Sequence, residues 1–167
     1  MNLRVKIKRV KDVELPKYAK PGDSGFDLVA AEDIIIEPAE TQIVPTGLSF
    51  EIPSGYELQV RPRSGISFQT ELLVILGTVD SSYRGEVGVI VKNLMPFINM
   101  TADGLRTIDD EFKETPEEWE AGTYIIRKGD RIAQGVIAPV ETTNFVEVDK
   151  LSESDRGTGG FGSTGVK

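Results

Sequence analysis

Residues 77–93 gather side chains that could do chemistry at a bend of the chain. Asp80 supplies a carboxylate, Tyr83 a ring with a hydroxyl, Arg84 a guanidinium, and two serines add hydroxyls. An alternating run of valines follows, as on one face of a strand. Because Asp and Ser are common turn formers, the pattern predicts a strand, a tight hairpin and a second strand. Taken alone, it is typical of an ordinary surface hairpin.

The sequence lacks the residue types that most often carry catalysis. Its 167 residues include no histidine and no cysteine, so the usual general base, the commonest metal ligand and a thiolate nucleophile are excluded. Catalysis would use carboxylates, hydroxyls, Arg, Lys, backbone amides or a bound ion. The absence of cysteine favours a reduced, cytoplasmic setting. No apolar run approaches the roughly 20 residues of a membrane span, and the N-terminus does not resemble a signal peptide.

The charge is unevenly distributed along the chain. The net charge of −8 argues against non-specific binding of nucleic acid. Residues 103–120 hold eight acidic side chains against Arg106 and Lys113, so the other residues are nearly neutral and could form basic pockets. The acidic segment is interpreted as a solvated surface insertion, with a docking surface for another protein or a modifier of the site as the alternatives.

Two segments carry chemistry suited to phosphate groups. Arg156 offers a fork for phosphate oxygens, the glycines after it expose backbone N–H groups, and Ser163 and Thr164 add hydroxyls. Phe161 lies alone among these glycines and suits stacking on a flat ring. Residues 63–65 offer a guanidinium, a hydroxyl and bare backbone again. Together with the Asp80 hairpin, these segments indicate a ligand with a flat base and several phosphates.

The tail is not a dinucleotide-binding fingerprint. Its G-x-G-x-x-G pattern lies five residues from the end of the sequence, without the following helix that the motif needs. No G-x-x-x-x-G-K-[ST] sequence occurs, which excludes a Walker loop.

Short strands separated by Pro and Gly predict an all-β sandwich or barrel. Strands are expected near residues 3–7, 34–36, 42–45, 48–52, 56–60, 72–76, 124–127, 131–138 and 145–148. The run 72–76 is expected to be buried. One short helix is predicted at residues 115–118, where Thr115, Pro116 and Glu118 form a capping pattern, with Trp119 docking it on the body.

Five short motifs, in order, resemble the trimeric dUTPase (deoxyuridine triphosphate nucleotidohydrolase) family. They are Gly25-Phe26-Asp27-Leu28, Pro62-Arg63-Ser64-Gly65, Gly77 to Asn93, Gly129 to Gln134, and Arg156 to Gly165. Each motif alone is weak, but five in order are specific. The resemblance covers nearly the whole chain outside residues 94–123.

The resemblance implies hydrolysis of dUTP to dUMP and pyrophosphate by water attack at the α-phosphate. Asp80 matches the carboxylate that orients and activates the water. Because a carboxylate is a weak base, most of the rate gain would come from positioning and charge stabilisation. Asp27 matches a carboxylate held near Mg²⁺, through water. Tyr83 matches the ring against deoxyribose, which rejects a 2′-hydroxyl.

The resemblance also implies the substrate contacts. The backbone of residues 77–79 reads uracil, a neighbouring subunit supplies phosphate contacts, and the tail closes as a lid. The implied binding residues are Arg63, Ser64, Gly65, Gly77, Thr78, Val79, Tyr83, Gln134, Arg156, Phe161, Gly162, Ser163 and Thr164.

The implied fold is a single domain spanning residues 1–167, a distorted jelly-roll or β-sandwich-like barrel that assembles as a homotrimer with shared sites. It carries an acidic insertion at about 94–123 and a flexible glycine-rich arm at about 152–167.

Two departures from the family pattern stand out. Val74-Ile75-Leu76 replaces the Asn and Pro that usually lead into Gly77, so one polar contact to the base is missing or replaced. The insertion adds about 20 residues to a connection that is usually short. The alternatives to a dUTPase are a dCTP deaminase-type relative, whose glutamate would correspond to Glu86, and a protein-binding regulator that acts through the insertion.

Overall fold

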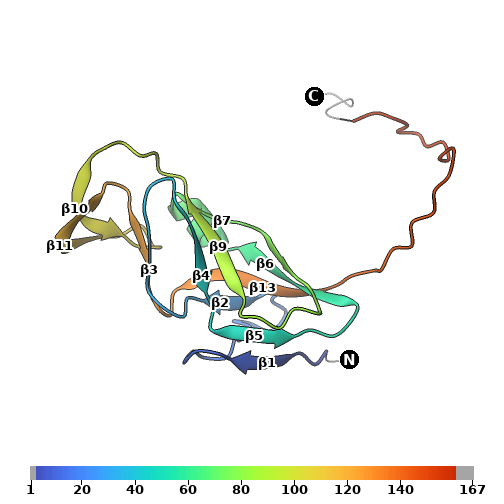
Figure 1. Cartoon of the computed structure of the whole chain (residues 1–167), viewed down its shortest axis with the longest axis horizontal. Coiled ribbons are helices and arrows are strands. Elements are labelled where there is room, and N and C mark those ends of the chain that lie inside the picture. The colour runs from blue at the N-terminus through green and yellow to red at the C-terminus, as the bar shows by residue number, and fades with distance from the viewer. Residues whose placement is uncertain (1–2, 161–167) are drawn as a thin grey trace.

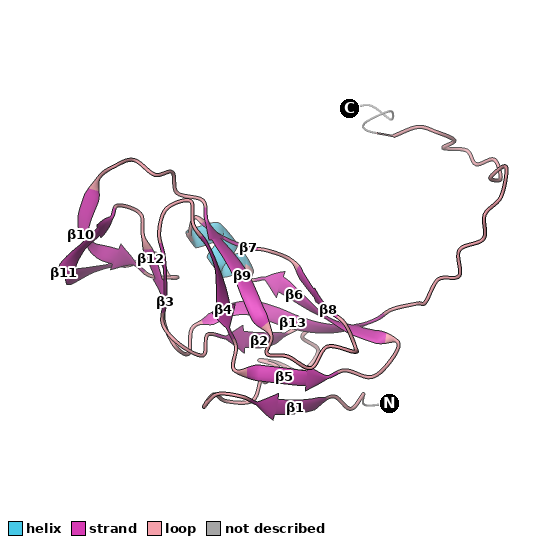
Figure 2. Cartoon of the chain, viewed as in Figure 1, coloured by secondary structure: helices cyan, strands magenta, loops and turns pink. Residues whose placement is uncertain are grey.

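The computed structural model describes residues 3–160, in which the chain forms thirteen strands and one short helix (Figures 1 and 2). The elements are β1 (Lys6–Arg9), β2 (Phe26–Val29), β3 (Ile34–Ile36), β4 (Thr41–Pro45), β5 (Leu48–Glu51), β6 (Tyr56–Pro62), α1 (Ser64–Gln69), β7 (Leu72–Val74), β8 (Gly77–Val79), β9 (Gly88–Asn93), β10 (Thr101–Arg106), β11 (Phe112–Glu120), β12 (Tyr124–Ile126) and β13 (Arg131–Pro139). In these residues, no helix is long and apolar enough to cross a membrane.

The strands form small sheets around one core, as the predicted all-β class requires. The sheets have the orders β2-β13-β6-β8, β4-β9-β7, β1-β5 and β11-β10-β12-β3. Alternation along the strands places one set of side chains inside. Val44, Val89 and Val91 are fully buried, whereas Ile43 and Ile90 on the opposite face are exposed. Each sheet of the body therefore contributes one apolar face to the core, and β4-β9-β7 also keeps an apolar outer face.

The predicted hairpin at residues 77–93 is wrong. β8 pairs with β6 and lies in one sheet, whereas β9 pairs with β4 and β7 in another. Residues 80–87 therefore bridge two sheets instead of closing a hairpin. Periodicity finds the strands correctly but does not specify their partners, because pairing is decided by contacts distant in sequence.

The helix predicted at residues 115–118 is also wrong, because this segment lies within β11. β11 pairs antiparallel with β10, with Leu105 opposite Lys113. The Thr115 hydroxyl donates to the Glu117 carbonyl (2.9 Å) and accepts from Trp119 Nε1 (3.1 Å), so it caps nothing. Pairing with β10 overrides the local capping pattern. The helix forms instead at α1, directly after the Arg63 bend.

Three further expectations need correction. Residues 145–148 form no strand, and the chain from β13 onward leaves the body as an extended arm (Figure 1). Within 72–76, only Leu72 and Val74 are buried, because β7 has just one face on the core. The N-terminal strand is β1, whose four residues are all exposed rather than half-buried.

Asn93 joins the body to both ends of the insertion and is fully buried. Its Nδ2 donates to the carbonyls of Ile36 (3.0 Å) and Gly122 (2.9 Å), and its Oδ1 accepts from the Met95 N–H (3.0 Å). Asn93→Ala leaves these buried groups unpaired, so we expect the free energy of unfolding to fall by about 3 kcal/mol. Chemical denaturation measures this loss.

The exposed Asn144 provides the matched control, since Asn144→Ala removes no described hydrogen bond of the body and should leave stability within about 0.5 kcal/mol. Equal stability of the two variants would show that the Asn93 hydrogen bonds do not hold the insertion to the body.

Candidate active site

The connection between β8 and β9 forms a tight turn that presents Asp80 and Tyr83. The Tyr83 N–H donates to the Asp80 carbonyl (3.0 Å), and the Tyr83 hydroxyl donates to the Glu86 carbonyl (3.1 Å). The Asp80 side chain is exposed, and a shallow cavity of about 200 Å³ is lined by residues 78–80, Tyr83 and residues 86–88. A Cβ atom on Gly85 would clash with the Tyr83 ring, so a glycine there allows the ring to fold over the turn.

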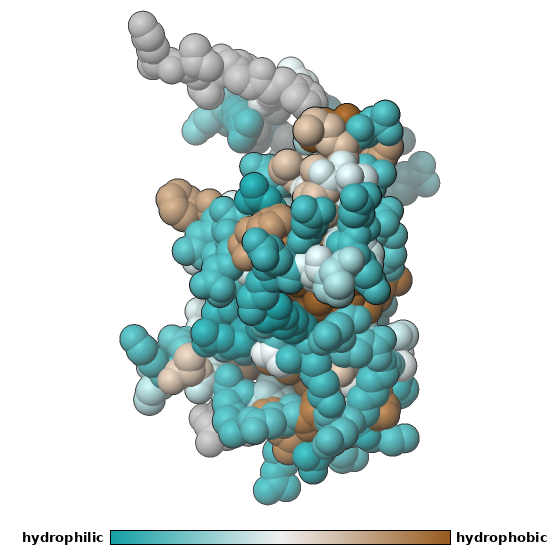
Figure 3. Space-filling model, turned by 90° about the vertical axis from the view of Figure 1, so that its left-hand side faces the viewer, coloured by the Kyte–Doolittle hydropathy of each residue, from teal (hydrophilic) through white to brown (hydrophobic). Residues whose placement is uncertain are grey.

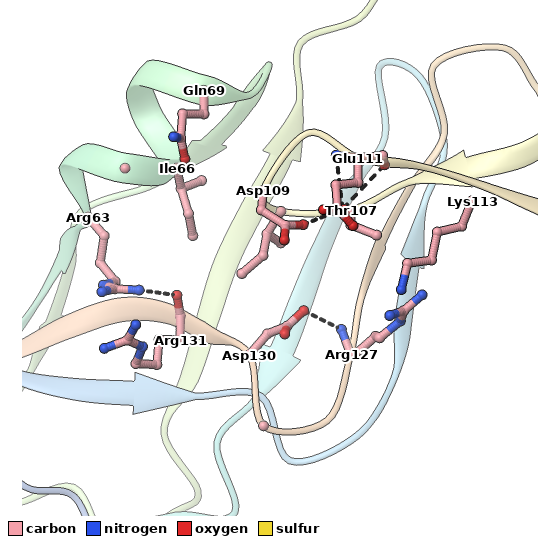
Figure 4. A pocket seen from close by; sticks show the side chains of 13 residues that line it. Arg63, Ile66, Gln69, Thr107, Asp109, Glu111, Lys113, Arg127, Asp130 and Arg131 are labelled. Atoms are coloured by element: carbon pink, nitrogen blue, oxygen red, sulfur yellow. Dashed lines mark hydrogen bonds between the residues drawn. The ribbon is translucent and has the colours of Figure 1, made fainter.

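A second cluster surrounds Asp27 on β2. Arg63 Nε lies 3.3 Å from Asp27 Oδ1, and Arg131 Nη1 lies 3.5 Å from Asp27 Oδ2. Arg63 Nη1 donates to the Arg131 carbonyl at 2.9 Å (Figure 4). Among residues 3–160, Arg63 Nε is the buried side-chain polar atom that lacks a hydrogen-bond partner. Two guanidinium groups thus meet one carboxylate with donor capacity left for an anion.

Strand register explains why these residues meet. β13 lies between β2 and β6, with Gln134 opposite both Asp27 and Arg61. Arg63 follows directly after β6 and reaches back to β13. Of the sequence-predicted residues, the structure therefore brings together Asp27, Arg63 and Gln134, with Ser64 and Gly65 in the adjoining first turn of α1.

The two clusters lie at opposite ends of β6. Val79 pairs with Leu58, which places Asp80 beside the Glu57 end of β6, whereas Arg63 follows the other end. Six residues of extended strand between Glu57 and Arg63 span about 20 Å. The carboxylate proposed to orient water and the arginine proposed to hold phosphate are therefore far apart within one chain.

The described part of the arm does not reach either cluster. Residues 139–158 are exposed throughout, and the arm runs away from the body (Figure 1). Arg156 Nε donates to the Gly159 carbonyl within the arm itself (2.9 Å). The predicted residues Phe161, Gly162, Ser163 and Thr164 lie outside the described residues.

Comparisons with known proteins identify the family. The sequence profile of the dUTPase family matches residues 11–100 and 120–165. This chain belongs to the dUTPase family. It is 44% identical to the deoxyuridine 5′-triphosphate nucleotidohydrolase of Thermobifida fusca, covering 98% of this chain and 79% of that protein. It is 41% identical to the enzyme of the same name from Nautilia profundicola, covering 98% of this chain and 99% of that protein.

Solved dUTPase structures share the fold. A variant of the Staphylococcus bacteriophage 80alpha dUTPase, solved with dUpNHpp, has a TM-score of 0.94 and 35% identity, covering 98% of this chain and 99% of that chain. A variant of the dUTPase from phage phi11 of S. aureus, described with a structural Mg(II) ion, has a TM-score of 0.86 and 28% identity, covering 90% and 99% of the two chains. The jelly-roll prediction is confirmed.

Arg131 is a further candidate site residue, and it was not predicted from the sequence. The fourth motif was assigned a single contact residue, Gln134, although Arg131 lies inside the same motif. Its ion pair with Asp27 and its carbonyl contact with Arg63 place it in the second cluster. The position of an arginine within a family motif could have indicated this role. Its closeness to Asp27 and Arg63, however, follows only from the pairing of the strands.

The segment predicted as an insertion, at about 94–123, contains β10 and β11, which extend the sheet of β12 and β3. Residues 101–119 lie outside the family match. Figure 3 looks onto this end of the molecule, whose surface is mostly hydrophilic with small hydrophobic patches. The loop between β10 and β11 borders a cavity of about 450 Å³ that Arg63, Gly65 and Arg131 also line (Figure 4). The insertion therefore lies directly beside the Asp27 cluster.

Proposed function

We propose that this protein hydrolyses dUTP to dUMP and pyrophosphate. A water molecule attacks the α-phosphorus, the bond to the bridging oxygen between the α- and β-phosphates breaks, and pyrophosphate leaves. Family membership and the names of relatives above 40% identity support this activity. The observation that carries it is the pair of clusters. Asp80 and the Tyr83 ring lie at one end of β6, and Asp27 lies with two arginines at the other end.

We propose distinct roles for the parts of the first cluster. Asp80 orients and activates the attacking water, and its exposed carboxylate leaves room for one. Tyr83, fixed by its hydrogen bond to the Glu86 carbonyl, lies against deoxyribose and excludes a 2′-hydroxyl. The backbone of Gly77 to Val79 reads the uracil edge.

We propose that the second cluster holds the phosphates. Arg63 and Arg131 provide guanidinium forks, Ser64, Gly65 and Gln134 add polar contacts, and the arm brings Arg156, Phe161, Gly162, Ser163 and Thr164 as a lid.

The second cluster also fits a magnesium ion that takes few protein ligands. In residues 3–160, no group of three or more His, Cys, Asp or Glu side chains could hold a metal. Asp27 already faces two arginines, so it would hold the ion through water, while phosphate oxygens supply most of the ligands. When bound, the ion shields the charge of the phosphates.

A homotrimer would complete the site, because Asp80 and Arg63 of one chain lie about 20 Å apart along β6. The outer face of β4-β9-β7 supports assembly. Ile43 is 64% exposed, Ile90 lies directly opposite it, and Leu73 of β7 is on the same face. Such an apolar face is typical of a subunit interface. Ile75 and Leu76, which belong to the Val74-Ile75-Leu76 stretch found in place of the usual Asn and Pro, extend this exposed apolar surface.

The arm also supports assembly. Phe145, Val146, Val148 and Leu151 are 54–90% exposed on a segment that leaves the body. Such side chains are expected to pack on a neighbouring subunit, which would carry the arm to the neighbour's site.

Pyrophosphate release from dUTP, dTTP, UTP and dCTP in the presence of Mg²⁺ tests the function. We expect turnover of dUTP alone, because the uracil fit excludes a methyl group and Tyr83 excludes a 2′-hydroxyl. An exclusion of this kind corresponds to a ratio of kcat/KM values on the order of 10² or more. Turnover of dTTP or UTP within tenfold of dUTP would contradict the specificity assigned to the first cluster.

The same assay separates the alternatives. A deaminase-type relative would release ammonia from dCTP, and its glutamate would have to be free for proton transfer. Glu86 Oε1 instead accepts a hydrogen bond from the Gly47 N–H (2.8 Å), which favours a structural role. The docking of another protein on the acidic insertion stays a prediction.

A further inference from the structure

The insertion places basic side chains on the wall of the cavity that holds Arg63 and Arg131. Lys113 of β11 and Arg127, just after β12, line this cavity of about 450 Å³ together with the two arginines of the second cluster. In Figure 4 the ends of the Lys113 and Arg127 side chains point toward each other. The cavity is therefore basic at both ends.

Lys113 and Arg127 form no direct ion pair within the described part of the chain, although their charges act on the nearby Asp109 carboxylate. Among the described residues, neither side chain has a carboxylate within 4.0 Å, and neither side chain donates a hydrogen bond. The interaction of Arg127 with Asp130 uses the Arg127 backbone N–H. The repulsion between two neighbouring cations is offset when an anion lies between them. This arrangement suits an anion that enters the cavity.

Three carboxylates also line the cavity: Asp109, Glu111 and Asp130. Asp130 accepts the Arg127 N–H (2.8 Å). Asp109 accepts a hydrogen bond from the Thr107 hydroxyl, and this bond, with a backbone N–H and the charges of Lys113 and Arg127, holds the pKa of Asp109 below its ordinary value. An aspartate is ionised at neutral pH, so Asp109 opposes the binding of a phosphate anion in this cavity. The basic residues of this wall should thus strengthen anion binding, and the acidic residues should weaken it.

We propose that the insertion supplies Lys113, together with Arg127, as an additional subsite for the pyrophosphate portion of the substrate. The proposal rests on the proposed function and concerns the β- and γ-phosphates of dUTP and the pyrophosphate that leaves. Arg63 and Arg131 hold one end of the phosphate chain, and Lys113 and Arg127 bind the end that projects toward the insertion. Because residues 101–119 lie outside the family match, this subsite is added to the motifs that the family shares. Lys113 is therefore a substrate-binding residue that does not contact the bond between the α-phosphorus and the bridging oxygen.

Lys113→Gln and Asp109→Asn test the subsite by their opposite effects. We expect Lys113→Gln to raise the pyrophosphate Kd and the dUTP KM about tenfold, which corresponds to about 1.4 kcal/mol, with kcat within about twofold. Asp109→Asn keeps the acceptor for Thr107 but removes a charge, so we expect both constants to fall about threefold. Isothermal titration with pyrophosphate and steady-state dUTP hydrolysis, both with Mg²⁺, measure these changes.

Matched variants separate the subsite from general damage. Lys113→Arg keeps the charge and should stay within about threefold of the wild type. Lys128→Gln removes a neighbouring exposed charge that does not line this cavity and should change neither constant. Arg127→Gln should reproduce the effect of Lys113→Gln, and it tests the subsite independently if the Lys113 variant folds poorly.

The pyrophosphate Kd and the dUTP KM together show whether the subsite binds free pyrophosphate, the phosphates of dUTP, or both. A change in pyrophosphate Kd assigns the subsite to free pyrophosphate as well, and a change confined to KM assigns it to the substrate alone. The same Kd and KM in Lys113→Gln, Arg127→Gln and the wild type would overturn the proposal. The calorimetric titration needs no turnover. A wild type that binds pyrophosphate through Lys113 but leaves dUTP intact would therefore overturn the proposed function and not the subsite.

Discussion

Asp80→Asn is expected to abolish nearly all hydrolysis of dUTP. The amide has the size of the carboxylate but cannot accept a proton from the attacking water, and loss of such a group costs about 10²–10⁴-fold in kcat. Because the Asp80 side chain is exposed on the β8–β9 turn and forms no described side-chain hydrogen bond, the variant should fold normally and bind dUTP within about threefold of the wild type. Single-turnover pyrophosphate release and titration with a non-hydrolysable dUTP analogue measure the two effects.

Asp103→Asn is the matched control, since Asp103 is an exposed carboxylate of β10 that lines neither candidate cavity. It should hydrolyse dUTP at the wild-type rate. If Asp80→Asn retained more than about a tenth of the wild-type kcat, the water-activating role of Asp80 would be excluded.

Mixed trimers of two inactive variants are expected to regain activity. Asp80→Asn lacks the carboxylate and Arg63→Gln lacks a phosphate contact, so each homotrimer should be nearly inactive. If a site joins Asp80 of one chain to Arg63 of its neighbour, every trimer that contains both variants keeps one intact site of its three, so the doubly purified species should regain about a third of the wild-type activity. Co-expression with two affinity tags, followed by pyrophosphate assays on the doubly purified species, measures the recovery.

The control for this experiment co-assembles Asp80→Asn with a chain that carries both substitutions. Those trimers contain no Asp80 and should remain inactive. Mixed trimers that are as inactive as their parents would show that Asp80 and Arg63 of each site come from the same chain, which would remove the main argument for shared sites.

The family could be recognised from sequence because its motifs are short and local. Asp80 and Tyr83 fall within one turn, and Arg63 lies within a short motif. Their residue types and spacing can therefore be recognised without knowledge of the fold. The strands predicted at 34–36, 124–127 and 131–138 correspond to β3, β12 and β13, because short apolar segments bounded by Pro or Gly mark them locally.

The pairing of strands that are distant in sequence could not be predicted from the sequence. The alternation in 87–93 specifies which side chains share a face, but it does not specify that β9 lies between β4 and β7 rather than beside β8. The capping pattern at Thr115 failed for the same reason, because pairing with β10 outweighs a local helix preference worth about 1 kcal/mol.

The sequence by itself determined the chemistry: without histidine or cysteine, the reaction depends on carboxylates, arginines and backbone groups, and the five motifs name them. The tertiary structure alone decided where these groups lie. It set Asp80 and Arg63 at opposite ends of β6 and brought Lys113 of the insertion onto the wall of the cavity beside Arg63 and Arg131. The physical reason is that residue types carry reactivity, whereas distances follow from pairing between strands that are far apart in the chain.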